Sequence, residues 1–180
     1  MLSLLPDFAD PLRLCSLGKV YEGTIALADL PRLAPLLTSS EGEAAFALAF
    51  AMDEERRPRI RVQVKATLIV ECQRCLGPMG FEVDSVSDLV AVSGPDEADR
   101  LPAELDPLLV EDGQVVLRSL IEDELILAIP SAPTHVDDEC AVDLETVNAS
   151  PRGCEEPGDQ GKPNPFAALA ALKSDIDESD

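Results

Sequence analysis

The chain has 180 residues, of which 46% are hydrophobic and 3% aromatic, and its formal net charge is −21. The length suits one domain with additions and the apolar content allows a sizeable core, but so few aromatic side chains exclude a broad surface for stacking nucleic-acid bases. The charge disfavours contact with phosphate and favours a basic protein partner, and no apolar run is long enough to cross a membrane.

The N-terminal third predicts strands around one short helix. Residues 1–16 are expected to be irregular, and an α+β domain is expected over residues 17–140. Alternating side chains predict strands at residues 18–27 and 43–52. Residues 28–37 predict a short helix, which Pro35 must end or kink.

The cleanest pattern in the chain covers residues 59–70, where apolar and polar side chains alternate. Such alternation predicts a half-buried strand, paired as a hairpin with residues 43–52. A tight knuckle is expected at residues 71–78, followed by a third strand at residues 81–92. The predicted sheet is therefore a mostly antiparallel β-meander.

The later elements are shorter, apart from one helix. Residues 94–107 predict a loop, and residues 108–116 predict two short strands around the Asp112-Gly113 turn. Residues 117–129 place apolar side chains on one stripe and predict the main helix, which Pro130 ends. With the helix at residues 28–37, this makes two helices that cover the sheet.

The C-terminal part predicts a flexible acidic arm. Residues 1–75 hold 10 acidic and 9 basic residues, whereas residues 76–180 hold 25 and 5. An acidic disordered linker is expected at residues 141–163, a short helix at 164–173 and an acidic tail at 174–180. The helix is a candidate for docking on a partner or back on the domain, through Asn164, Pro165, Phe166, Leu169 and Leu172.

Four residues form a candidate metal site. Cys72 and Cys75 stand in the predicted knuckle, and His135 and Cys140 follow the main helix. Zinc prefers four nitrogen or sulfur ligands, and a knuckle after a strand commonly supplies two of them. The alternatives are reduced cysteines in a turn without metal, or thiol redox chemistry at Cys72 and Cys75. A redox pair normally lies at a helix N-terminus, whereas this pair lies between strands.

A row of cations is the candidate RNA-binding surface. Its members are Arg57, Arg59, Arg61, Lys65 and Arg74. Because side chains alternate along a strand, the first four are expected on one side, where they could follow an RNA backbone. The alternative is a solvated sheet face whose cations pair with acids of the same protein.

Three acidic residues of the main helix, Glu122, Asp123 and Glu124, are expected on a solvated helix face. The other interpretation is that they form a contact surface for a basic ribosomal protein.

These motifs together resemble the large ribosomal RNA subunit accumulation protein YceD family. The resemblance lies in Glu71-Cys72-Gln73-Arg74-Cys75-Leu76, in the helix from Leu117 to Pro130, in Pro133-Thr134-His135 with Cys140, and in the residues from Lys162 to Leu169. It runs from about Gly18 to Lys173. The family often has Asp at the position of Val116, so the main helix here lacks that N-cap.

The resemblance implies a role in the synthesis, processing or stability of large-subunit (23S) rRNA. The expected partners are that rRNA or a pre-ribosomal particle, with ribosomal or assembly proteins, in the cytoplasm. No catalytic residue comes with the resemblance, so the protein is expected not to be an enzyme. The alternatives are a zinc- or thiol-dependent redox protein that uses Cys72 and Cys75, and a protein-binding adaptor without direct RNA contact.

Overall fold

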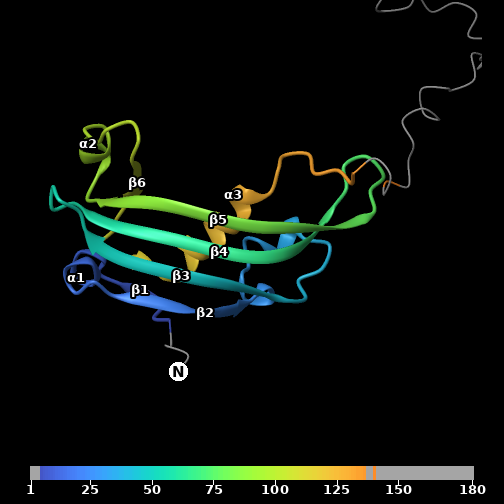
Figure 1. Cartoon of the computed structure of the whole chain (residues 1–180), viewed down its shortest axis with the longest axis horizontal. Coiled ribbons are helices and arrows are strands. Elements are labelled where there is room, and N and C mark those ends of the chain that lie inside the picture. Colours follow the sequence, from blue (N-terminus) through green and yellow to red (C-terminus); the bar gives the residue numbers. More distant parts are fainter. Residues whose placement is uncertain (1–4, 137–139, 141–180) are drawn as a thin grey trace, which may run out of the picture. The chain divides into compact units, whose positions relative to one another are not determined.

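The computed structural model describes residues 5–136 and Cys140. Its centre is a five-stranded sheet with the order β2-β3-β4-β5-β6 (Figure 1). The strands are β2 Val20–Ala26, β3 Glu43–Met52, β4 Pro58–Glu71, β5 Pro78–Val92 and β6 Asp106–Leu109. The first four are antiparallel neighbours, whereas β6 runs parallel to β5. The α+β fold and the meander from β2 to β5 are confirmed, and the sheet is mixed at its β6 edge.

The prediction of an irregular segment at residues 1–16 is wrong for residues 8–16. Strand β1, Phe8–Ala9, pairs with strand β7, Val115–Val116. Helix α1, Pro11–Ser16, follows it, and the side chain of Asp10 accepts a hydrogen bond from the Arg13 N–H as the N-cap. The strand pairs far along the chain, so local sequence gives no signal for it.

The predicted helix at residues 28–37 is also wrong. Two 3₁₀ turns replace it, η1 Leu27–Asp29 and η2 Ala34–Leu36, because Pro31 and Pro35 interrupt a continuous helix. Leu27, Leu30 and Leu33 are nevertheless fully buried. The segment therefore covers the core, as expected, without being an α-helix.

The expected hairpin at residues 108–116 is reduced to one bridge between Glu111 and Gln114. Asp112 and Gly113 between them have φ of 50° and 73°, as a tight type I′ turn requires. The flanking strands pair elsewhere, β6 with β5 and β7 with β1. A one-turn helix, α2 Pro95–Ala98, lies within the loop predicted at residues 94–107.

The core lies between the sheet and helix α3, Leu117–Ala128, which runs behind the sheet in Figure 1. The alternation of β4 is confirmed, since Ile60, Val62 and Val64 are fully buried. Leu117, Ile121 and Leu125 face them from α3 and are also fully buried. Neither α3 nor any other helix in the described part of the chain is long and apolar enough to cross a membrane.

The start of α3 lacks a side-chain cap, as expected from Val116. The Leu117 N–H instead donates to the Asp7 carbonyl, at 3.2 Å. The residue before β1 thus satisfies one of the unpaired N–H groups that every helix start exposes. The N-terminal segment that sequence patterns do not resolve is what completes the main helix.

Two carboxylates of α3 are buried, contrary to the expected solvated face. Glu122 is 3% exposed, and its Oε1 accepts the N–H groups of Arg32 at 2.5 Å and Leu33 at 3.0 Å. Glu124 is 9% exposed and accepts the hydroxyls of Ser85 at 3.0 Å and Ser87 at 2.5 Å on β5. Asp123 between them is exposed and pairs with the Arg32 guanidinium. Buried carboxylates are tolerated because donors of the protein replace water.

Replacing Glu122 by alanine should lower the free energy of unfolding by about 2–3 kcal/mol, because two N–H groups lose their acceptor in a buried place. Urea denaturation measures this change. Asp123→Ala is the matched control. It removes the same charge from the neighbouring residue, which forms an exposed ion pair with Arg32. Equal losses in the two variants would show that Glu122 does not anchor the η1–η2 segment.

Candidate metal centre

The connection between β4 and β5, residues 72–77, forms a closed turn that we call the knuckle. The Cys72 N–H donates to the Gly77 carbonyl at 2.9 Å, and the Leu76 N–H donates to the Cys72 carbonyl at 2.8 Å. Leu76 has φ of 59°, a left-handed conformation that costs a non-glycine residue roughly 1–2 kcal/mol. The turn closes in this way only because β4 and β5 continue to pair up to Glu71 and Pro78.

The segment after α3, residues 131–136, returns to the knuckle. The Gln73 N–H donates to the Pro133 carbonyl at 2.8 Å, and the His135 N–H donates to the Cys72 sulfur at 3.4 Å. Pro130 ends the helix and starts this return. The two parts of the candidate site, about 60 residues apart in sequence, therefore meet through backbone contacts.

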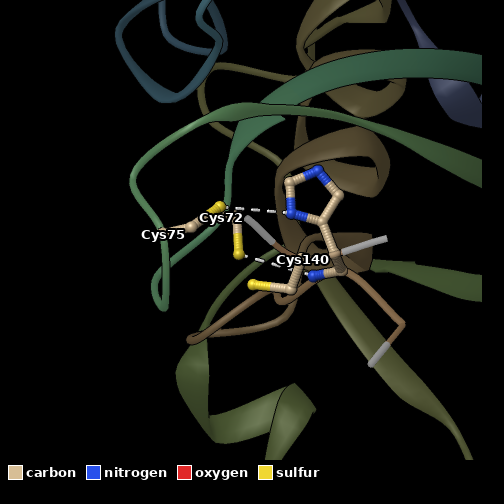
Figure 2. Close-up of side chains that lie close together, drawn as sticks. Cys72, Cys75 and Cys140 are labelled. Carbon is tan, nitrogen blue, oxygen red and sulfur yellow. Dashed lines mark hydrogen bonds between the residues drawn. The ribbon is translucent and has the colours of Figure 1, made fainter. Parts of the chain in front are cut away.

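The structure brings together all four residues of the sequence-derived metal site. One ligand atom from each of Cys72, Cys75, His135 and Cys140 lies within 4.8 Å of every other. Figure 2 shows the three cysteine side chains gathered in one place, two from the knuckle and one from the chain after α3. Cys72 is fully buried and the other three are half-buried. These four groups could hold a metal ion.

Each ring nitrogen of His135 has a partner, and the two contacts together fix the orientation of the imidazole. Its Nδ1 lies 3.4 Å from the Cys75 sulfur, and its Nε2 lies 3.3 Å from the Pro78 carbonyl. With the proton on Nε2, that nitrogen donates to Pro78, and the lone pair of Nδ1 faces the sulfur atoms. A ligand histidine whose second nitrogen donates to a carbonyl is the usual arrangement around a bound metal.

Hydrogen bonding favours the charged form of the buried thiol. Burial raises the pKa of Cys72, but N–H groups of Cys75, His135 and Arg74 stabilise its thiolate and lower the pKa to about 5. The pKa of His135 is raised, first by its hydrogen bond to Cys72 and further by Cys75. These shifts favour the thiolate at Cys72 and a proton on His135, and the thiolate is the form that binds metals.

The cations of the predicted RNA-binding row lie in three different environments. Arg59, Arg61 and Lys65 stand on the open face of β4, opposite the core. Arg57 precedes the strand and pairs with two acids of the β3–β4 turn, Asp53 at 2.6 Å and Glu55 at 2.8 Å. Arg74 lies in the knuckle beside the metal cluster. The five residues therefore do not form one continuous line.

Two cations on the open face have acidic partners directly across the sheet. Arg61 stands opposite Asp88 and pairs with it at 3.4 Å, and Lys65 stands opposite Asp84 and pairs with it at 2.8 Å. All four side chains are 40% exposed or more, so water screens each pair. Each of these two cations therefore has a carboxylate beside it on the face where an RNA phosphate would approach.

Comparisons with known proteins point to one family. The family model described as large ribosomal RNA subunit accumulation protein YceD matches residues 60–173. A curated Haemophilus influenzae protein of the same name is 32% identical over 172 residues, which are 94% of this chain and 96% of that protein. The chain belongs to the YceD family. No solved structure matches it at a significant level.

The YceD family match spans all four candidate ligands, from Cys72 to Cys140. It also spans the predicted docking helix, with Asn164, Pro165, Phe166, Leu169 and Leu172, which lies outside the described residues. The docking role of that helix, and the linker and tail around it, therefore stay predictions.

Sequence reasoning missed the acids that face the cation row, although a signal was present. Asp84 and Asp88 lie on the same face of the third strand, and the register of the β4–β5 hairpin places them beside Lys65 and Arg61. It also missed the carbonyls of Pro78 and Pro133, since backbone acceptors leave no trace in residue type. The pairs of Lys65 with Asp84 and of Arg61 with Asp88 follow when the hairpin register is continued residue by residue from the knuckle along both strands.

Replacing Asp84 and Asp88 by asparagine should strengthen low-salt binding of single-stranded RNA about three- to tenfold, because Lys65 and Arg61 lose their acidic partners. Fluorescence anisotropy on a labelled oligonucleotide measures the affinity. Glu22→Gln with Glu43→Gln is the control, since it removes two exposed acids from the same open face. An equal gain in both double variants would mean that net charge alone governs the affinity.

Proposed function

We propose that this YceD family protein is a non-catalytic, cytoplasmic factor that supports the synthesis, processing or stability of 23S rRNA. The observation that carries this proposal is the match to the Haemophilus influenzae rRNA accumulation protein over 94% of the chain. The gathering of Cys72, Cys75, His135 and Cys140 as four metal donors supports a structural role for these side chains.

We further propose that the protein reaches the pre-ribosomal particle mainly through a basic ribosomal or assembly protein. The acids opposite Arg61 and Lys65 support this, because phosphate would compete with carboxylates that already lie 3.4 and 2.8 Å away. The net charge of −21 supports it too, since it repels bare RNA and attracts a cationic protein. Direct RNA contact through Arg59 and its neighbours is the competing proposal.

We propose zinc as the metal of the cluster. Three thiolates and one imidazole are a donor set that zinc takes in tetrahedral structural sites. The full burial of Cys72 favours this over thiol redox chemistry, because an exchange reaction needs a sulfur that another thiol can approach. A site in which all four positions are occupied by protein atoms also leaves none for a substrate.

Deleting the gene for this chain should lower the ratio of 23S to 16S rRNA, and re-expression should restore it. The Arg61→Gln, Lys65→Gln double variant should restore the ratio as well as the wild type if contact runs through a protein partner. Arg13→Gln with Arg100→Gln is the matched control, since both arginines are exposed and lie off the open face of β4. RNA gel analysis measures the ratio.

Loss of rescue confined to the Arg61 and Lys65 variant would favour direct RNA contact over a protein partner. An unchanged rRNA ratio after deletion would count against the role in rRNA accumulation itself.

Full-length protein purified without chelators should contain about one zinc ion per chain. Cys75→Ala should lower that content, because three donors no longer complete the tetrahedron. Cys15→Ser is the control, since Cys15 is a buried thiol that donates to the Arg59 carbonyl away from the cluster. Elemental analysis by mass spectrometry measures the metal. Zinc content that responds equally to both substitutions would argue against a specific site.

A further inference from the structure

The segment after α3 has little apolar material with which to hold its position. Of residues 131–136, Pro133 alone is buried. Val136 is 74% exposed and adds nothing to the core. A short segment with a single buried side chain does not offset the conformational entropy lost when it is ordered. Its position must therefore depend on polar contacts.

Those polar contacts converge on the knuckle and its flanking residue. Pro133 accepts the Gln73 N–H, the His135 N–H reaches the Cys72 sulfur, and the His135 ring lies against Cys75 and the Pro78 carbonyl. The Gln73–Pro133 hydrogen bond joins two uncharged groups and adds little stability, whereas the contacts of His135 with the two sulfur atoms are stronger where the sulfur is a thiolate. These few contacts orient the segment, but they offset only part of the conformational entropy that is lost when it is ordered.

The four metal donors are divided equally between the two parts. The knuckle supplies Cys72 and Cys75, and the chain after α3 supplies His135 and Cys140. Two donors do not complete a tetrahedral zinc site, so neither part binds the metal tightly alone. Binding of the metal and docking of the segment are therefore thermodynamically linked, and each stabilises the other.

We infer that zinc acts as a clasp that holds residues 131–136 and Cys140 on the knuckle, and so fixes the point from which the chain beyond Cys140 begins. The inference rests on the proposed zinc occupancy and adds a structural role to it. In Figure 1 the knuckle lies at the opposite end of the sheet from α1 and α2. The clasp joins the end of the described domain to that far end, and closes a loop that contains β5 and α3.

Because metal binding and docking of the segment are linked, a substitution in one part of the site should loosen the other part. Local damage alone would not have this effect. Cys75→Ala changes the knuckle, yet it should release the segment after α3. Cys140→Ala changes that segment, yet it should loosen the knuckle. The reporters are the His135 amide, which donates to Cys72, and the Gln73 amide, which donates to Pro133.

Hydrogen exchange on the full-length protein tests the clasp, with one equivalent of zinc and after removal of metal by a chelator. In the wild type, chelation should speed exchange at Gln73 and His135 about tenfold or more. Each cysteine variant should show the same rise, at the reporter in the half that it leaves intact. Amides of β3 and β4 should keep slow exchange, which shows that the domain remains folded. Cys15→Ser should behave as the wild type.

Three results would overturn the clasp, and they are distinguishable. Zinc that is bound but whose removal changes exchange at Gln73 and His135 by less than about twofold would sink the clasp alone. Protein that takes up no zinc would sink both the clasp and the proposed metal. A rise limited to the altered half of each variant would also contradict the linkage.

Discussion

Strand β4 pairs with β5 along almost its whole length, from Arg59 opposite Val90 to Glu71 opposite Pro78. This single register determines three features at once. It closes the knuckle that holds Cys72 and Cys75, it sets Asp84 and Asp88 beside the cations of the open face, and it keeps the apolar side chains of β4 in the core. Because side chains alternate, a slip by one residue would turn the apolar face of β4 outward and dissolve all three features. The candidate site therefore depends on the same constraint as the core.

Helix α3 positions the second half of the metal cluster relative to the sheet. Glu124 accepts two serine hydroxyls of β5, and Glu122 accepts two N–H groups of the chain before β3. Hydrogen bonds of this kind are directional, whereas apolar packing alone tolerates sliding. The helix is thus held at one place along the sheet, so its end at Ala128 delivers His135 to the knuckle.

The parts of the structure that sequence patterns predict are those whose causes are local. The alternation of β3 and β4, the stripe of α3 and the knuckle around Cys72 each follow from a period or a spacing within a few residues. Sequence also predicts the metal cluster, because cysteine and histidine are rare enough to be matched across a long gap.

What sequence patterns do not predict depends on distant backbone groups. Glu122 looks like a surface residue until the N–H groups of Arg32 and Leu33, some 90 residues away, require an acceptor. The pairing of β1 with β7 and the parallel placement of β6 are also set by contacts across the domain. A pattern of residue types carries no record of which backbone donors remain unpaired, so these features emerge only from the fold.

The charges of this molecule can be reconciled with a role in rRNA accumulation through their placement. A protein with a net charge of −21 gains little from bare phosphate, and its open sheet face sets Lys65 and Arg61 against carboxylates. Under the proposed function, the contact is instead with a basic ribosomal or assembly protein. An acidic surface suits such a partner, because its negative charge attracts a basic protein in the same way as the phosphates of RNA do. Under the proposed function, Lys65 and Arg61 balance the acids beside them, and the excess of acidic side chains in the chain favours the basic partner.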